Sequence, residues 1–330
     1  MVEQSPVRKG GTGADALRET LRLAVACEAL GYERFWVAEH HDLPGIASTS
    51  PEILIGQIAG ATSTIRVGSG GVMLPHYSAF KVAENFRMLE TLFPGRIDLG
   101  LGRAPGGNQR TLLALAHPRH PIDVRAYPEQ VDDLIGYLGE SLPPEHPFAG
   151  LRPGPPTAGM PEIWLLGSGI GSAQLAARRG LPFSFAHFFG NAEQGPAIVE
   201  HYRSHFQASP LFAEPRVHVA VQVMCAETRE QAEWHAASLR VARLQMARNQ
   251  GGSGIISPDE AARYVFTPEE LHFLAHSGMR ATTGDAAQVA AELQEVAARY
   301  GTDQLGVVTI CYDFAARLLS YELVAKSCLA

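Results

Sequence analysis

Residues 34–41 read Arg34-Phe35-Trp36-Val37-Ala38-Glu39-His40-His41, an apolar run followed at once by three titratable side chains. An apolar run of this length predicts a buried strand. The segment from Ala14 to Leu30 precedes it with apolar residues at helical spacing, and Gly31 predicts the end of that helix. Ser50-Pro51 predicts the start of a second helix, since proline is tolerated in a first turn. The local order is therefore helix, strand, helix.

The same alternation continues along the chain. Further strands are predicted at residues 65–74, 96–102, 163–166, 182–186, 217–224 and 304–310, with residues 1–4 as a short first strand. Further helices are predicted at residues 78–93, 128–142, 172–179, 197–207, 229–248, 285–300 and 314–328. Repeated strand-then-helix units indicate a parallel sheet covered by helices. About eight units fit a (β/α)8 TIM barrel better than an open doubly wound sheet.

The predicted fold class is therefore α/β, with one TIM-barrel domain over residues 1–330. The proline-rich segment at residues 104–160 predicts an irregular insertion after strand four, around the helix at residues 128–142. The Gly/Ser-rich stretch at residues 249–257 leads into a segment without a strong pattern up to residue 278.

Composition narrows the class of function. The chain has 27 Lys and Arg against 34 Asp and Glu, a net charge of −7, which gives no electrostatic reason to expect nucleic acid or an anionic membrane as partner. None of its 4 cysteines forms a Cys-x-x-Cys pair, which disfavours a disulfide framework or a structural zinc site. No signal peptide and no membrane-spanning run is apparent, so we expect a cytoplasmic protein.

Chemistry in a TIM barrel lies at the carboxyl ends of the strands. There, residues 167–172 (Gly-Ser-Gly-Ile-Gly-Ser) follow a strand and enter a helix. Two interpretations stay open: a phosphate cradle of backbone N–H groups at a helix start, or a tight turn with Ser172 as the N-cap. Arg103 follows the preceding strand directly, and its forked guanidinium suits a phosphate.

Two adjacent histidines, His40 and His41, raise the question of a metal site. Adjacent residues at a strand end point in opposite directions, so the two rings cannot easily bind one ion. A metal would need further ligands such as His76 or His187, and strands four and five offer no matching carboxylates. We therefore predict no metal, and one histidine as a general base or hydrogen-bond donor near neutral pH.

Glycines interrupt the strand at residues 65–74, at Gly68, Gly70 and Gly71. Glycines inside a strand mark a bulge or the close approach of a ligand. A flat ring stacked on the backbone would suit them, and so would the curvature of the barrel alone.

Three segments, residues 31–41, 68–75 and 93–103, together resemble the bacterial-luciferase-like flavin-dependent monooxygenases. The resemblance covers nearly the whole chain and is weakest at residues 105–160. It implies a monooxygenase that uses reduced FMN as co-substrate, with molecular oxygen and a small organic substrate. It further implies a separate flavin reductase as partner, a homodimer, and a mobile lid after strand seven at residues 249–278.

The resemblance also implies roles for single residues. His40 matches the first histidine of the family's His-His pair, the catalytic base near the flavin. Gly70-Gly71 matches a non-prolyl cis peptide beside the isoalloxazine ring. Arg103 matches the arginine that binds the flavin phosphate, and Gly169 and Ser172 match the backbone and hydroxyl contacts to that phosphate.

The chain departs from the family pattern at three places. Gly102 stands where the luciferase catalytic subunit has a reactive cysteine, so no thiol chemistry is expected. The first strand is shortened. A second phosphate-binding arginine is not assigned, and Arg110, Arg119 and Arg125 all stay candidates.

Two other functions are compatible with the same fold. One is a deazaflavin-dependent hydride-transfer oxidoreductase, which would bind deazaflavin and consume no oxygen. The other is a non-catalytic flavin-binding protein, since a fold does not determine a function.

Overall fold

The computed structural model describes residues 1–104, 106–156, 159–189, 192–248, 254–277 and 280–329. Within these residues no helix has both the length and the apolar character needed to cross a membrane.

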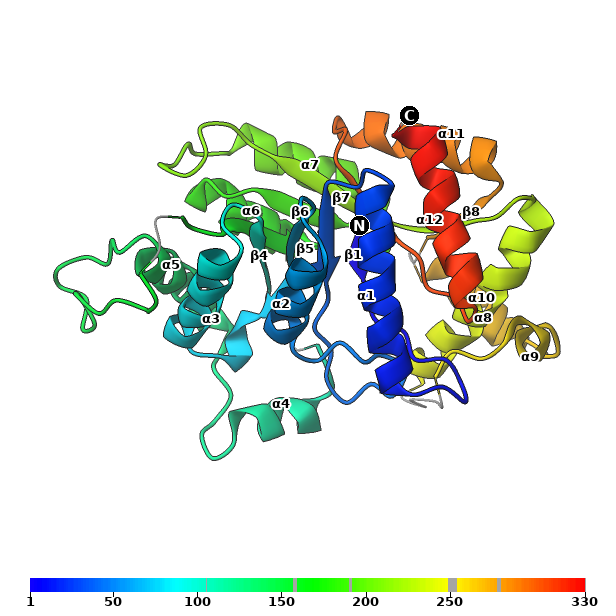
Figure 1. The fold of residues 1–330 in the computed structure, drawn as a ribbon, viewed down its shortest axis with the longest axis horizontal. Helices are drawn as coiled ribbons and strands as arrows, with labels where there is room; N and C mark the ends of the chain where they lie inside the picture. Colours follow the sequence, from blue (N-terminus) through cyan, green and yellow to red (C-terminus); the bar gives the residue numbers. More distant parts are fainter. Residues whose placement is uncertain (105, 157–158, 190–191, 249–253, 278–279, 330) are drawn as a thin grey trace.

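Eight parallel strands form a nearly closed barrel (Figure 1). They are β1 (Val2–Glu3), β2 (Arg34–Val37), β3 (Arg66–Met73), β4 (Ile97–Gly102), β5 (Glu162–Gly167), β6 (Phe183–Ala186), β7 (Val217–Cys225) and β9 (Leu305–Val308). Each pairs with the next in this order, and β9 pairs with β7 and lies beside β1. The short β8 (Thr282–Gly284) pairs with the carboxyl end of β7. The predicted TIM barrel is thus confirmed, with β1 as its short first strand.

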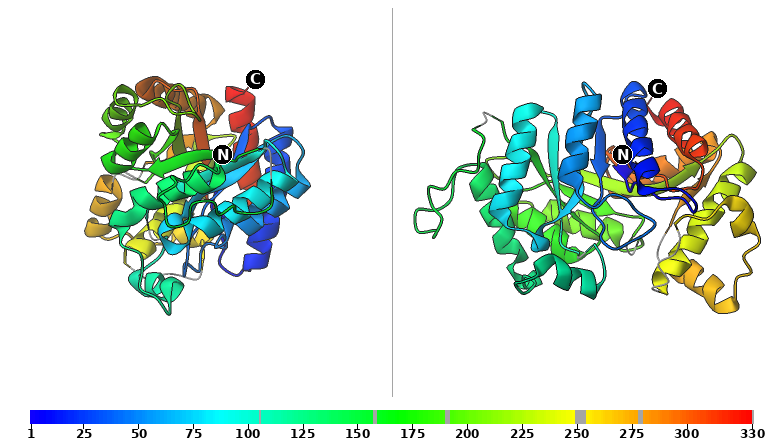
Figure 2. Two further views of the ribbon diagram at one scale, coloured as in Figure 1. Left: turned by 90° about the vertical axis from the view of Figure 1, so that its left-hand side faces the viewer. Right: turned by 60° about the horizontal axis from the view of Figure 1, so that its bottom comes forward.

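Helices surround the barrel on its outside, as the views in Figures 1 and 2 show. They are α1 (Gly13–Ala29), α2 (Pro51–Ala61), α3 (Ala79–Leu92), α5 (Tyr127–Leu138), α6 (Ile170–Arg179), α7 (Gly195–Ser204), α8 (Arg229–Ala247), α11 (Ala286–Tyr300) and α12 (Phe314–Cys328). Their apolar faces pack on the outer face of the sheet and form the main core, for example through Leu23, Ile55 and Phe86, which are fully or almost fully buried.

Several short elements were not predicted from the sequence. They are the 3-10 turns η1 (Leu74–His76) and η2 (Val124–Ala126), the helices α4 (Gln109–Ala116), α9 (Pro258–Ala262) and α10 (Pro268–His276), and β8. Helix α4 has no buried residue, so no apolar face toward the core predicts it from the sequence. Helix α10 begins with a capping box in which Thr267 and Glu270 bond reciprocally, a signal that the sequence does contain.

The interior of the barrel is closed at the amino ends of the strands by a polar plug. Asp98 of β4 is fully buried, and its carboxylate accepts hydrogen bonds from Arg34 Nη1 (2.7 Å), Trp36 Nε1 (2.8 Å) and Arg66 Nε (2.8 Å). One carboxylate therefore ties β2, β3 and β4 together. His218 of β7 packs beside Trp36 and shares a 2.7 Å hydrogen bond with Ser184 Oγ.

A second buried ion pair lies where β1 meets β9. Glu3 and Arg317 are both buried, and the Glu3 carboxylate accepts from Arg317 Nη2, from Ser5 N (2.8 Å) and from Thr20 Oγ1 (2.9 Å). Arg317 Nε in turn donates to the carbonyl oxygen of Thr309, directly after β9 (3.0 Å). Side chains rather than a sheet ladder therefore join the first strand to the last.

We expect Asp98→Ala to destabilise the fold by about 3–5 kcal/mol, because it leaves two guanidinium groups and an indole N–H without their buried acceptor. Urea unfolding of the two proteins measures the difference. Asp303→Ala is the control, since Asp303 is exposed, and we expect it to change stability by less than about 0.5 kcal/mol. A loss below about 1 kcal/mol for Asp98→Ala would contradict the structural role.

Burial holds the pKa of His218 well below its ordinary value, so the folded protein keeps this imidazole neutral. Below the unfolded pKa of about 6.5, the unfolded chain binds a proton that the folded chain does not. Stability should therefore fall with decreasing pH by up to about 1.4 kcal/mol per pH unit from this one group. The non-titrating variant His218→Gln should lose less stability than wild type between pH 7 and pH 5. Equal pH slopes of the unfolding free energy would contradict this assignment.

Candidate active site

The carboxyl ends of the barrel strands meet at one rim, which faces downward in Figure 1. Helices α4 and α9 lie on this side of the barrel (Figure 1). In the right-hand view of Figure 2, α9 and α10 stand away from α5, at the opposite end of the molecule. The segments after β4 and after β7 therefore flank the mouth of the barrel.

Arg103 and the start of α6 meet on this rim. Strands β4 and β5 pair with Leu101 opposite Leu165, so the residues that follow each strand emerge side by side. An ideal Cβ atom placed on Gly171 would lie 3.5 Å from Arg103 Nη1, whereas one on Gly169 would meet nothing within 4 Å. The Arg103 side chain is exposed, and within the described residues it has no carboxylate at ion-pair distance. Arg103 and Gly169 thus border an open space at a helix N-terminus.

Ser172 does not act as the N-cap of this helix. Helix α6 begins at Ile170 with Gly169 as its N-cap, so Ser172 lies in the first turn, with its hydroxyl beside Gly167. Any side chain at Gly167 would collide with that hydroxyl. The N-cap interpretation of Ser172 is therefore wrong, because the chain enters the helix two residues earlier than its apolar pattern predicts.

The glycines of β3 form the predicted bulge. The register between β3 and β4 shifts between Ser69 and Val72, and the Gly70–Gly71 peptide is cis. A Cβ on Gly71 would lie 2.7 Å from the carbonyl oxygen of Gly100, so close packing of the two strands already requires glycine there. A Cβ on Gly70 would point toward Trp36 in the barrel interior.

Glu39 organises the ends of β2 and β3, a role that the sequence did not reveal. Its carboxylate is fully buried and accepts from Met73 N (2.9 Å) and from the Tyr77 hydroxyl (2.7 Å), and it pairs with His41 Nε2 (2.7 Å). Burial, and then the Glu39 charge, raise the pKa of Tyr77, so that phenol stays protonated. Its place directly before the two histidines was the only signal in the sequence.

The two adjacent histidines have different surroundings, as expected for opposite orientations. The His41 ring binds Glu39 and lies edge-on to His76, with ring centres 5.6 Å apart. His40 is half-buried, and burial lowers the pKa of its imidazole, which keeps the ring neutral at pH 7. His187 is bonded through Nδ1 to the Tyr300 hydroxyl (2.9 Å). In the described part of the chain, no group of three or more metal-ligating side chains gathers.

The candidates for a second phosphate-binding arginine lie in the insertion after β4. Arg125 is paired with Asp123 two residues away. Arg110 lies in the first turn of α4, and Arg119 follows the end of that helix. All three side chains are exposed, and the structure does not single one out.

The sequence of this chain is similar to a family model and to relatives along almost its whole length. The model of the luciferase-like monooxygenase family matches residues 3–304. A luciferase-like monooxygenase of Escherichia coli K12 is 37% identical over 324 residues, which cover 98% of this chain and 94% of that protein. The N-acetyl-S-alkylcysteine monooxygenase of Bacillus subtilis is 37% identical over 331 residues, which cover 100% of this chain and 98% of that protein.

A solved structure is also similar to this chain, in both its fold and its sequence. The crystal structure of apo-MsnO8 is similar with a TM-score of 0.89 and 37% identity, covering 99% of this chain and 97% of that chain. The family model and the relatives cover almost the whole barrel, including the rim with Arg103 and the start of α6. The chain therefore belongs to the luciferase-like monooxygenase family.

Proposed function

We propose that the chain is a flavin-dependent monooxygenase that uses reduced FMN and molecular oxygen on a small organic substrate, with a separate reductase supplying the reduced flavin. The observation that carries this proposal is the position of Arg103 beside the glycine-lined start of α6. An exposed guanidinium, a helix N-terminus and open space above Gly169 together suit a phosphate group.

The residues present fit FMN in three ways. Arg103, Gly169 and Ser172 would hold the phosphate, and Gly70 and Gly71 would lie behind the ring. His40, neutral at pH 7, would accept a proton as general base. When bound, FMN supplies the electron and oxygen chemistry, while the protein binds, orients and excludes water.

The relatives support the reaction class. One of them carries the name N-acetyl-S-alkylcysteine monooxygenase and is 37% identical along the full chain. This supports a small organic substrate for the present chain as well.

We expect Arg103→Ala to weaken FMN binding by about 10- to 100-fold, because a charge-assisted hydrogen bond to the phosphate is worth about 1.5–3 kcal/mol. Riboflavin lacks the phosphate, so its affinity should change little. Fluorescence titration with both ligands measures the two dissociation constants. Arg18→Ala, which removes an exposed arginine on α1, should bind both ligands as wild type does.

Equal losses for FMN and riboflavin would show that Arg103 acts on the fold or the ring rather than on a phosphate.

Anaerobic titration with reduced FMN and with reduced deazaflavin separates the enzymatic alternatives. Tight binding of deazaflavin without oxygen consumption would replace the monooxygenase proposal with a hydride-transfer enzyme. Tight binding of oxidised FMN, with no substrate-dependent oxygen use when a reductase is added, would replace it with a non-catalytic flavin-binding protein.

A further inference from the structure

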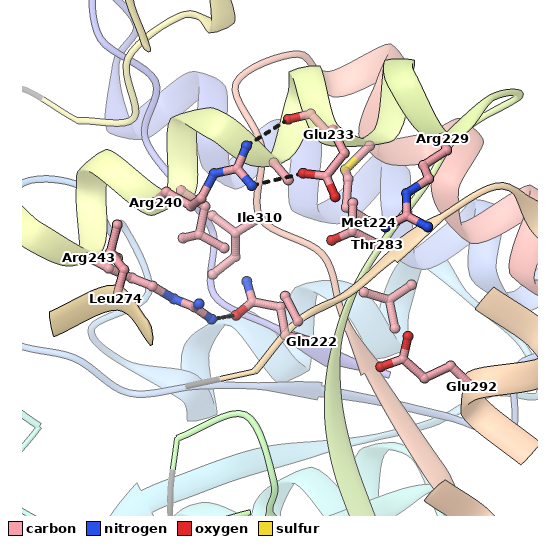
Figure 3. A pocket seen from close by; sticks show the side chains of 14 residues that line it. Gln222, Met224, Arg229, Glu233, Arg240, Arg243, Leu274, Thr283, Glu292 and Ile310 are labelled. Carbon is pink, nitrogen blue, oxygen red and sulfur yellow. Dashed lines mark hydrogen bonds and ion pairs between the residues drawn. The ribbon is translucent and has the colours of Figure 1, made fainter. Parts of the chain in front are cut away.

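A cavity of about 350 Å³ lies beside the carboxyl end of β7, between α8, α10 and β8 (Figure 3). Its volume is within the range of about 300–1,000 Å³ that is usual for small-molecule sites. The wall combines apolar side chains, such as Leu274 of α10 and Ile310 just beyond β9, with charged side chains of α8. Among the latter, Arg240 is paired with Glu233 at 2.8 Å, so these two charges compensate each other.

Gln222 brings an uncharged polar group to this cavity from the inner face of the barrel. It is opposite Val308 where β7 pairs with β9, and it comes two residues after Ala220. Val308 and Ala220 belong to the cluster inside the barrel, and Ile310 packs on that cluster. Because the side chains of a strand alternate between its faces, Gln222 points inward like Ala220. Its amide therefore lies where the cavity meets the barrel interior.

Arg243 fixes which end of the Gln222 amide is free to meet a ligand. The Arg243 guanidinium donates to the amide oxygen of Gln222, as Figure 3 shows. An arginine side chain has only donors, so the atom turned toward it must be the oxygen. Arg243 has a further interaction in the protein, and its part here is only to orient the amide. The amide nitrogen is thus turned away from Arg243, on the side of Ile310 (Figure 3).

The amide nitrogen of Gln222 donates to no acceptor in the part of the chain that the structure describes. The residue is only 4% exposed, and its side chain is bonded there to Arg243 alone. A buried N–H group that stays unpaired is destabilising, so a donor at the wall of a cavity indicates an acceptor on a ligand. The amide is neutral, and an uncharged carbonyl oxygen would satisfy it without burying a charge.

Gln222 also lies across the barrel from the glycines of β3. In a barrel of eight strands β3 and β7 are four strands apart, so they form opposite walls. With the flavin ring resting on Gly70 and Gly71, as proposed above, the other face of the ring is turned toward the wall that carries Gln222. A molecule bound beside Gln222 would therefore lie on the open side of the ring.

We propose that Gln222 is a substrate-binding residue whose amide nitrogen donates a hydrogen bond to a carbonyl oxygen of the substrate. The substrate class is therefore a small organic molecule with an uncharged carbonyl group. This inference rests on the proposed function, because it assigns the substrate of that candidate active site. The carbonyl oxygens of the flavin ring are the other acceptors that the amide could meet, and a flavin titration separates the two.

Two probes that differ only in the acceptor test the proposal. They are hexan-2-one and 2-methylhex-1-ene, in which a methylene group replaces the carbonyl oxygen, and ligand-observed NMR measures their binding without flavin. Gln222→Glu keeps an oxygen for Arg243 and replaces the donor with a second oxygen. We expect this variant to bind the ketone about fivefold or more weakly and the alkene within about twofold of wild type, because only the ketone loses a hydrogen bond in a buried site.

The stretching frequency of the carbonyl group gives a second readout, which a merely structural role of Gln222 would not change. A hydrogen bond weakens the carbonyl double bond and lowers this frequency. Infrared difference spectra of bound, isotope-labelled hexan-2-one should therefore show a lower frequency in wild type than in Gln222→Glu. Equal frequencies in the two proteins would overturn the proposal.

Gln231→Glu is the matched control. It makes the same change in an exposed side chain of α8 that does not line the cavity, so it should bind both probes as wild type does. Circular dichroism verifies that each variant is folded. The proposal fails if wild type binds neither probe, if Gln222→Glu affects both probes equally or not at all, or if Gln231→Glu weakens binding of the ketone as much.

The flavin titration distinguishes this proposal from the proposed function. Gln222→Glu should bind FMN and riboflavin as wild type does. If it loses affinity for both ligands, the amide serves the flavin ring, and the carbonyl proposal fails while the flavin proposal stands. If Arg103→Ala leaves FMN binding unchanged while Gln222→Glu loses affinity for the ketone alone, the flavin proposal fails and the carbonyl site stands.

Discussion

The parallel pairing of β4 with β5 places Arg103 beside the first turn of α6, and the candidate phosphate site depends on that adjacency. Neither partner would suffice alone. An exposed arginine is an ordinary surface residue, and a glycine-rich helix start is often only a turn. Together at one rim they combine a positive charge, backbone N–H groups and open space, which an anion requires.

Buried carboxylates hold the barrel in the shape that this rim needs. Asp98 ties β2, β3 and β4 at the closed end, and Glu3 joins β1 to α12 through Arg317. At the open end Glu39 plays a similar part, since it accepts hydrogen bonds from Met73 of β3 and from Tyr77 just after η1, and it pairs with His41. Buried charges are costly, and here each carboxylate is satisfied by several donors. A plug at one end and a polar rim at the other are thus built by similar interactions.

The sequence predicted most of the barrel because its strands and helices are buried and therefore strongly patterned. Ile97, Leu99 and Leu101 of β4 alternate as a strand must, and all are fully buried. Helix α4 was not predicted because none of its residues is buried, and β8 was not predicted because it has only 3 residues. In the site, Arg103 and Gly169 could be placed from strand ends alone. The contacts of Glu39 with Met73 and Tyr77 could not, since they join residues 34 and 38 positions apart, which only the fold brings together.

A crystal structure of the protein with FMN would show whether the flavin phosphate lies between Arg103 and the start of α6, as we propose. We expect the phosphate oxygens within hydrogen-bond distance of the Arg103 guanidinium and of the backbone N–H groups at the start of α6. A well-defined FMN whose phosphate lies elsewhere on the rim, with Arg103 turned to solvent, would contradict it.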